Sequence, residues 1–440
     1  MHRILLCVVA CATAMPVAQA QESLPQMREE LKNLQQKVDE LEGRVKDAES
    51  TATQAASQAS ARPQTESALN PGISVILNGV YANLSRDPAT YRINGFIPTM
   101  GDVAPPTRGF SLGESELAFT ANVDHLLRGT LVGAISPDND TIGVEEGYIQ
   151  TIALSRGFTI KAGRFFSAVG YQNQIHAHAW DFTDAPLAMR AFLGGQLGED
   201  GVQLRWLAPT ALYWDMGTEL GRGRAFPASL TPSGKNGAGS LNFFTHVGGD
   251  IGQSLAWQTG LSHLRTNPRD RTFDDPSAGI TDSFSGTSRL WVASGILKWA
   301  PNGNATDNNF KLQGEYFHRN EEGTLVFDSP GSAIANGFAS RQSGWYAQGV
   351  YQFMPQWRAG YRYDRLDSGT VGIDTAGAAS FPILAGYQPK KHSVMVDWSP
   401  SEFSRLRLQV ARDYSRMGEA DNQLFLQYIV SLGAHGAHTF

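Results

Sequence analysis

The last stretch of the chain, Gln423 to Phe440, alternates between apolar and mixed positions. Leu424, Leu426, Tyr428, Val430 and Leu432 share one parity, whereas Gln427, Ser431 and Gly433 share the other. A period of two predicts a β-strand with one apolar face. A strand at the end of a chain leaves an open edge, unless it pairs with the first strand and closes a barrel. This stretch therefore predicts a closed barrel, with an ordinary sandwich strand as the alternative.

The same alternation recurs from Gly72 onward in runs of about ten residues, the length of a tilted transmembrane strand. Short connections, such as residues 124–125 and 155–157, alternate with long ones, such as 86–108 and 368–389. Long loops at one end and short turns at the other are typical of outer-membrane barrels, and an even number of strands places both termini in the periplasm. The predicted strands are 72–85, 109–123, 126–136, 144–154, 158–166, 201–208, 211–223, 240–251, 254–266, 288–300, 309–321, 344–354, 356–367, 390–399, 404–415 and 421–440.

Within single strands, charged residues share one face and large apolar residues share the other. In 356–366, Trp357 and Tyr361 oppose Arg358 and Arg362. Charges are costly at the lipid midplane and tolerated in a wet lumen, so the charged faces are expected to point inward. Strand 144–154 fits poorly, because it has acidic residues on both parities. The predicted pore-lining residues are Glu114, Glu116, Lys311, Glu315, Arg319, Arg358, Arg362 and Asp364.

The residues before the first strand predict three further segments. Residues 1–20 have a basic start, an apolar core and the small-x-small end Ala18-Gln19-Ala20 of a signal peptide. In residues 21–60, apolar positions alternate at spacings of three and four, from Leu24 and Met27 onward, which predicts a coiled coil. Residues 61–71 read as a linker. We expect the coiled coil and the barrel to form a homo-oligomer; a trimer is favoured, although Val and Leu at the core positions also fit two strands.

Composition narrows the class of protein further. Both cysteines, at positions 7 and 11, lie in the signal peptide, which excludes disulfides and cysteine-based zinc sites in the mature chain. Loss of Arg3 from 36 basic residues, set against 42 acidic ones, makes the mature charge −7 and gives no support to nucleic-acid binding. No segment has the 18 or more apolar residues of a transmembrane helix. The exported chain is therefore a soluble β-protein or a membrane barrel.

The longest loop, Ser167 to Gly201, is unusually apolar, and residues 185–192 predict a short helix within it. We expect this loop to fold into the lumen and constrict it. It also contains His176 and His178, followed by Asp181. In an extended chain both imidazoles point the same way, about 6–7 Å apart, and nitrogen with carboxylate suits zinc or another divalent ion. The alternative is that these residues anchor the loop by hydrogen bonds.

Several long motifs resemble a porin-like outer-membrane family whose members are often labelled zinc-regulated, TonB-dependent outer-membrane receptors. That family is distantly similar to phosphate-selective porins, and final strands of outer-membrane barrels characteristically end in Phe, as this chain does at Phe440. The motifs are NPGISVILNGVYANLSRDPATYRI, RGFSLGESELAFTANVD, VEEGYIQTIAL, IKAGRFFSAVGY, IHAHAWDFTDAPL, RAFLGGQLGEDGVQLRWLAPT and GAHGAHTF. About fifty residues precede the first strand, too few for the plug domain of a TonB-dependent receptor, and the lumenal faces carry mixed charge.

These observations predict an all-β protein, an antiparallel transmembrane barrel of about sixteen strands over 72–440, in contact with outer-membrane lipid. The predicted function is passive diffusion of small hydrophilic solutes, with a divalent metal such as zinc as a candidate cargo and no required cofactor. A metal-binding receptor without an open pore is the main alternative. A barrel hydrolase is the third, although no Ser/His/acid arrangement stands out among ten scattered histidines.

Overall fold

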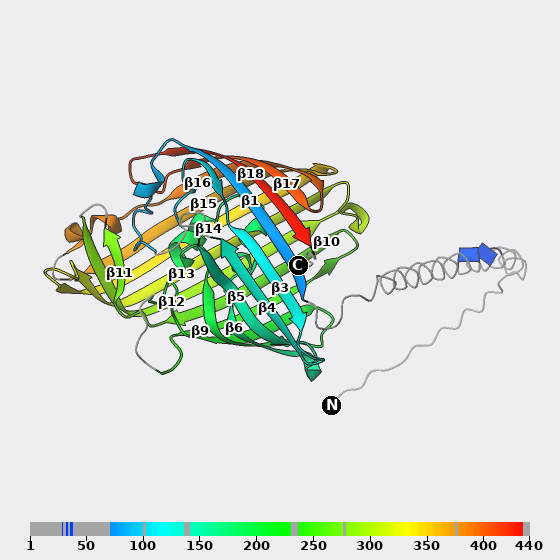
Figure 1. The fold of residues 1–440 in the computed structure, drawn as a ribbon, viewed down its shortest axis with the longest axis horizontal. Helices are drawn as coiled ribbons and strands as arrows, with labels where there is room; N and C mark the ends of the chain where they lie inside the picture. The colour runs from blue at the N-terminus through cyan, green and yellow to red at the C-terminus, as the bar shows by residue number, and fades with distance from the viewer. Residues whose placement is uncertain are drawn as a thin grey trace, which may run out of the picture. The chain divides into compact units, whose positions relative to one another are not determined.

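The first and last strands of the sheet lie side by side. In a computed structural model of the protein, β1 (Gly72–Leu84) pairs antiparallel with β18 (Asp421–Gly433), from Ser74 opposite Gly433 to Leu84 opposite Gln423. The strands between them pair in sequence around the ring, apart from the short strands β2 and β11, which each pair on one side. The predicted closure of the barrel is therefore confirmed (Figure 1). The structure describes residues 29, 32, 33, 36, 37, 71–99, 103–135, 141–229, 236–275, 279–374 and 377–433.

The eighteen strands of the described sheet form a sixteen-stranded antiparallel barrel. β2 and β3 both pair with β1 and together make one strand of the wall, broken at residues 113–114. β11 pairs with β12 alone, beyond the point where β10 and β12 pair directly. The remaining bounds are β2 (Gly109–Leu112), β3 (Ser115–Asn122), β4 (Leu127–Ile135), β5 (Ile142–Thr151), β6 (Phe158–Phe166), β7 (Gly198–Leu207), β8 (Tyr213–Gly221), β9 (Ser240–Ile251), β10 (Leu255–Thr266), β11 (Arg271–Asp275), β12 (Ile280–Trp299), β13 (Asn309–Phe327), β14 (Ile334–Met354), β15 (Trp357–Ile373), β16 (Lys390–Ser401) and β17 (Ser404–Asp413).

The predicted strand positions agree with the structure, but four strands are longer than predicted. β12, β13, β14 and β15 have 20, 19, 21 and 17 residues, about twice the length that a bilayer requires. Their extra residues, such as those of 334–343, are rich in Gly, Ser and Ala and lack the apolar alternation by which the strands were predicted. These extensions carry the long-loop end of the barrel well beyond the apolar band on this side.

The side chains follow the predicted pattern, with large apolar residues on the outside of the barrel and charged residues on the inside. Leu312, Tyr316 and Tyr361 are exposed on the outside, with 45%, 46% and 47% of their surface accessible. Glu315 and Arg362, on the opposite parity of the same strands, are buried inside. The outer face therefore matches lipid and the inner face is polar, as in a transmembrane barrel.

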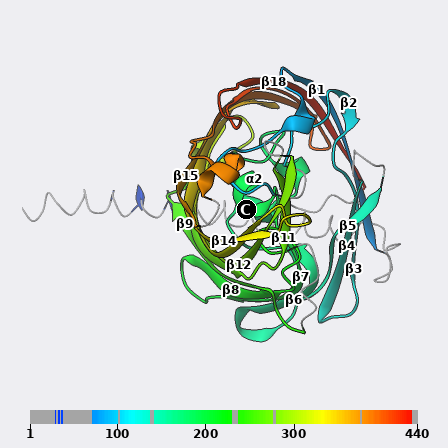
Figure 2. The ribbon, with the colours of Figure 1, turned by 90° about the vertical axis from the view of Figure 1, so that its left-hand side faces the viewer.

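Two apolar clusters occupy part of the barrel interior. The first includes the helix α2 (Leu187–Leu193), which Figure 2 shows inside the ring of strands. The second cluster joins Phe381 and Leu384 to Ile97 and to the parts of β12 to β14 nearest the long loops. The short 3₁₀ helices are η1 (Pro88–Thr90), η2 (Ser155–Gly157), η3 (Gln172–Gln174), η4 (Ala177–Ala179), η5 (Pro301–Gly303), η6 (Ala378–Ser380) and η7 (Pro382–Leu384).

The chain divides into one unit over Met1–Ser67 and a second over Ala68–Phe440. In the first, the described residues are Glu29, Lys32, Asn33, Gln36 and Lys37, all helical and exposed. The predicted signal peptide, the core positions of the predicted coiled coil, the linker up to residue 70 and the end of the last strand at 434–440 lie outside the described residues. Among the helices in the described part of the chain, none has the length and apolarity to cross a membrane.

Candidate functional site

The loop between β6 and β7 lies inside the barrel. It covers residues 167–197, four fewer than predicted, because β7 already begins at Gly198. Its backbone hydrogen-bonds to side chains on β8, β13, β15 and β17, strands that are spread around the ring. The loop therefore crosses the lumen, which is the position expected of a constriction.

Two buried carboxylates hold the start of this loop. Glu219 accepts hydrogen bonds from the Ser167 hydroxyl at 2.5 Å and from the Ala168 N–H at 2.8 Å. Glu315 accepts from the Tyr171 N–H at 2.6 Å. Between them, Gly170 has φ +72°, and a Cβ there would collide with the Glu315 carboxylate. Buried carboxylates that accept backbone N–H groups form strong hydrogen bonds, so this half of the loop is firmly attached to the wall.

The helix α2 closes one side of the lumen. Its first N–H, from Leu187, donates to Asp364 at 2.9 Å, and it ends at Gly194 in the left-handed conformation with φ 71°. The Phe192 ring stacks on Phe317 of β13, with ring centroids 5.8 Å apart. The apolar residues of the helix, which the sequence marks as needing burial, are fully buried against the wall formed by β12 to β15.

Asp181 lies against a basic stretch of wall. Its carboxylate binds Lys311 Nζ at 3.0 Å and Arg358 at 3.1 Å. Burial alone would raise the pKa of Asp181, but these two cations outweigh it and lower the pKa. The structure thus pairs Asp181 with two of the predicted pore-lining cations, and it is not part of the histidine group described below.

Asp184 is the centre of a second and denser network. It binds Arg190 at 2.9 Å within the loop, Arg362 of β15 at 2.9 Å and Lys391 of β16 at 2.6 Å. Burial would raise the pKa of Asp184, yet Lys391, Arg362 and Arg190 hold it well below its ordinary value. Three cations on one buried carboxylate attach the middle of the loop to the wall.

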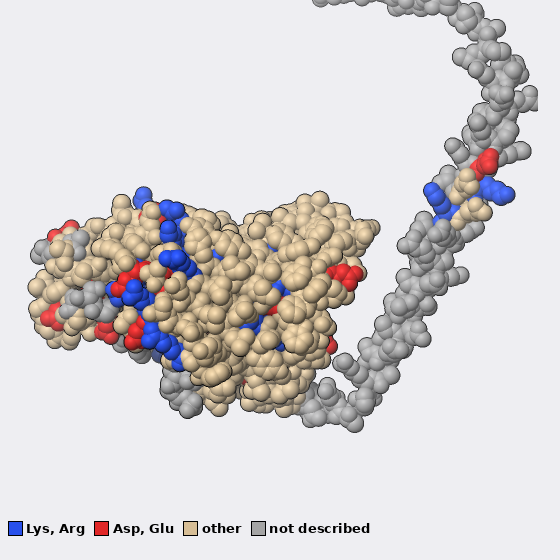
Figure 3. Space-filling view, turned by 90° about the horizontal axis from the view of Figure 1, so that it is seen from above, with Lys and Arg blue, Asp and Glu red and all other residues tan. Residues whose placement is uncertain are grey.

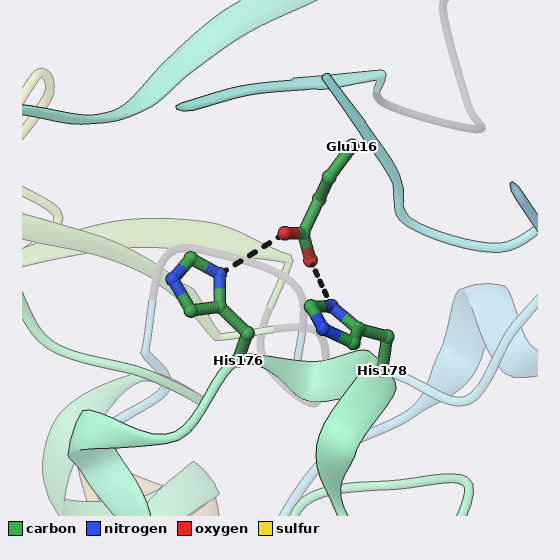
Figure 4. A group of neighbouring side chains, drawn as sticks. All are labelled: Glu116, His176 and His178. Carbon is green, nitrogen blue, oxygen red and sulfur yellow. Dashed lines mark hydrogen bonds and ion pairs between the residues drawn. The ribbon is translucent and has the colours of Figure 1, made fainter. Parts of the chain in front are cut away.

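Opposite this basic wall, His176 and His178 meet Glu116 of β3 (Figure 4). His176 Nδ1 is 3.2 Å from one Glu116 oxygen, and His178 Nδ1 is 2.7 Å from the other. The ring centroids are 5.7 Å apart. The segment is the 3₁₀ helix η4 rather than the extended chain that the prediction assumed, but both rings still face one carboxylate. One ligand atom from each of the three side chains lies within 4.8 Å of the others, a separation suited to one divalent ion.

A β-bulge adds two more carboxylates to this cluster. The pairing of β4 with β5 shifts register between Val132 and Gly133. A bulge leaves one residue unpaired and re-aims the side chains beside it. As a result Glu145 and Glu146, adjacent in sequence, both reach His176, at 3.3 Å and 3.0 Å.

With Glu114, which lies within 4.8 Å of Glu116 and Glu145, four carboxylates face two imidazoles. Burial would lower the pKa of His176, but Glu116, Glu145 and Glu146 raise it well above its ordinary value. When its carboxylates are ionised, the cluster is negative whichever protonation state the histidines adopt. We call Glu114, Glu116, Glu145, Glu146, His176 and His178 the acidic cluster.

The predicted pore-lining residues all lie on lumenal faces, but in two kinds of environment. Glu114, Lys311 and Arg358 are partly exposed, whereas Glu315 and its buried companions are covered by the loop. Arg319, for example, donates to the Ala191 carbonyl at 3.4 Å and to Gln342 at 2.7 Å. The buried ones are Glu116, Glu315, Arg319, Arg362 and Asp364.

The side of the lumen next to β3–β6 is polar and partly open. Thr120, Thr130, Tyr148 and Lys161 are half-buried there, with Lys161 Nζ 4.5 Å from the centre of the Tyr148 ring. A cavity of about 470 Å³ continues along β7–β10 near the short-turn end. The inward-facing residues that line it include Tyr171, Gln174, Ile175, Arg205, Tyr213, His246 and Gln258.

Several of the residues that build this site were not predicted. Glu145 and Glu146 had a signal in the sequence, because their opposite parities broke the strand pattern, as a bulge does. No signal in the sequence identified Asp184, Glu219 or Lys391, since their contacts depend on strands far apart in the chain.

Comparison with known proteins supports the fold. No family model matches the chain. An uncharacterized protein of Aquifex aeolicus is 28% identical over an alignment of 402 positions, which covers 86% of this chain and 81% of that protein. Among solved structures, OmpT, an outer membrane protein of Vibrio cholerae, matches with a TM-score of 0.52 at 9% identity over 84% of this chain and 100% of that chain. A loop L8 deletion mutant of OmpT matches with a TM-score of 0.51 at 10% identity, over 82% of this chain and 99% of the other. The chain thus has a porin-like outer-membrane barrel fold.

Proposed function

We propose that the protein is an outer-membrane channel for passive diffusion of small hydrophilic solutes, with both termini in the periplasm. The observation that carries this proposal is the uneven filling of the lumen. Apolar clusters and the α2 helix occupy the side next to β12–β15. Half-buried polar residues and the 470 Å³ cavity occupy the side next to β3–β10. A concentration gradient is sufficient to drive solutes along such a polar path.

Charge on the path favours small cations. The acidic cluster faces the partly open side, whereas most of the cations of the opposite wall are neutralised by Asp181, Asp184 and Asp397. Rings and clusters of acidic side chains select cations in channels. In a potassium chloride gradient across a planar bilayer, the reversal potential should show cation preference, and Glu116→Gln/Glu145→Gln should reduce it. An anion preference in the unmodified protein would contradict this assignment.

A divalent metal such as zinc is the cargo that the acidic cluster fits best. Two imidazole nitrogens and the Glu116 carboxylate form a set that suits zinc, with Glu145 and Glu146 nearby to complete it. Micromolar zinc should reduce single-channel conductance, and His176→Ala/His178→Ala should abolish that effect. His263→Ala/His318→Ala removes two histidines from the outer face and serves as the matched control. Equal zinc block in both double variants would contradict metal binding at this cluster.

A metal-binding receptor without an open pore is the second candidate. The observation that favours it is the extent to which loop 167–197 and the segments around Phe96 and Phe381 fill the lumen. Calorimetry with zinc chloride separates the two proposals when it is combined with bilayer recording. Stoichiometric zinc binding in a silent bilayer supports the receptor, and steady conductance supports the channel.

We further propose a homo-oligomer, most simply a trimer, held by the predicted coiled coil and the barrel. The prediction is that native mass spectrometry of the mature chain in detergent gives three copies. Removal of residues 21–60 should weaken the assembly, because the proposed coiled coil contributes to it; an unchanged trimer would contradict that contribution.

A further inference from the structure

Six strands show the same order of side chains on their outer faces. Along each, a lipid-facing apolar or aromatic residue is followed by a second outward residue, which is polar or aromatic on all but β17, and then by Arg or Lys, towards the long-loop end. On β15 the order is Tyr361, Tyr363, Arg365, and on β16 it is Val394, His392, Lys390. We call these cations, which are all exposed, the cationic belt. They are Arg265, Arg289, Arg341, Arg365, Lys390 and Arg412 on β10, β12, β14, β15, β16 and β17.

The cationic belt has no matching belt at the opposite end. On the same strands, the outward positions near the short turns are uncharged and mainly aromatic. They are Trp257, Trp299, Tyr351, Trp357, Trp398 and Leu406. If these cations served only to interact with water at the rim of the barrel, similar cations would be expected at both ends. Figure 3 shows Lys and Arg gathered at one level of the barrel, with Asp and Glu beside them, between a mostly uncharged band and the long-loop end.

Cations of the belt lie opposite one another across neighbouring strands. Arg265 lies directly opposite Arg289, and Arg365 directly opposite Lys390. Like charges placed directly opposite one another across strands are destabilising. Among the described residues, the belt cations form no ion pair within 4.0 Å: Arg365 donates to Gln388 at 2.8 Å, and Lys390 lies over the Tyr414 ring.

We propose that the cationic belt binds the phosphate groups of lipids in the outer leaflet. Each cation lies two or four residues beyond a lipid-facing apolar residue, which is about 7–14 Å along a strand and places it at headgroup level. Arg pairs with phosphate through two parallel N–H donors, and a phosphate between opposed cations removes their repulsion. In the proposed orientation the long loops lie outside the cell, so the cationic belt lies at the level of the outer leaflet. The ligand class is therefore a lipid that carries phosphate monoesters, in contact with the protein through both its tail and its headgroup.

The experiment titrates the full mature protein, in dodecyl maltoside, with bisphosphorylated lipid A and follows bound lipid by native mass spectrometry. Arg365→Gln/Lys390→Gln/Arg412→Gln removes three belt charges. Each cation near an anionic lipid surface contributes about five-fold, so lipid A should bind the triple variant on the order of 100-fold more weakly. The matched control, Arg128→Gln/Arg156→Gln/Arg269→Gln, removes three exposed charges outside the belt and should bind as the unmodified protein does.

Further measurements identify the source of the phosphate and control for misfolding of the variants. Phosphatidylcholine should bind weakly to all variants, and millimolar inorganic phosphate should not displace lipid A. Displacement by inorganic phosphate, or equal binding of phosphatidylcholine, would overturn the proposal, as would unchanged lipid A binding by the triple variant. If the triple variant loses the gel mobility of a folded barrel, Arg265→Gln/Arg289→Gln replaces it, with a loss on the order of 30-fold expected. Conductance is predicted to be the same in these variants, so failure here is separate from failure of the channel proposal.

Discussion

Substitution of Asp184 by Asn tests whether buried ion pairs hold the lumenal loop in place. Asn keeps the shape of the side chain and removes the charge that binds Arg190, Arg362 and Lys391. Only 6% of Asp184 is exposed, so water cannot replace the lost partner. Removal of one member of a buried ion pair costs about 3–5 kcal/mol. We expect the free energy needed to release the loop from the wall to fall by about that amount.

Trypsin cleavage after Arg190 measures loop release directly. Arg190 is 3% exposed in the folded loop, so cleavage requires opening. When opening is fast relative to cleavage, the rate follows the open population. A change of 3–5 kcal/mol then corresponds to roughly 150- to 4,000-fold faster cleavage. Asp200→Asn is the matched control, because its pairs with Arg164 and Arg224 are partly exposed and contribute about 1 kcal/mol or less. If both variants are cleaved at the same rate, the buried network does not hold the loop.

Three other predictions concern the same loop. The pKa of Asp184 lies well below its ordinary 3.8, so the stability from its charge is present above that pH and is lost as the pH falls through the lower folded value. The difference in melting temperature between the unmodified protein and Asp184→Asn should therefore be constant from pH 7 to about 4 and shrink only below it. Glu315→Gln should lower stability by about 2–3 kcal/mol in chemical denaturation, because charge-assisted hydrogen bonds from Tyr171 and Tyr346 are weakened. Phe192→Ala should cost about 3–5 kcal/mol and increase open-channel noise, since α2 loses its contact with Phe317; unchanged noise would mean that α2 does not border the conducting path.

The barrel was predictable because each strand alternates between apolar residues that face lipid and polar residues that face the lumen. Tyr361 alternates with Arg362, and Leu312 with Lys311, so parity alone identifies the two faces. The parts of β12–β15 nearest the long loops were missed because they stand beyond the lipid, where residues such as Asn336 and Gly337 need no apolar partner. The burial of Phe192 and Leu187 followed from their apolarity, although their partners did not.

The site was only half predictable, because its chemistry is assembled from distant strands. The short spacing of His176 and His178 identified them as candidate ligands, but Glu116 joins them from β3, about sixty residues earlier. Asp181 follows the histidines closely in sequence, yet the turn after η4 directs it to Lys311 and Arg358. Pairing between strands far apart in the chain decides these contacts, and it cannot be read from local spacing.

Single-channel recording of the mature protein in planar bilayers, in potassium chloride, tests the central claim most directly. We expect steady openings that prefer cations, and a reduction in conductance by micromolar zinc that His176→Ala/His178→Ala removes and His263→Ala/His318→Ala does not. A silent bilayer, with the protein shown to be inserted and folded by its gel mobility, would contradict an open channel and leave the plugged receptor as the function of this barrel.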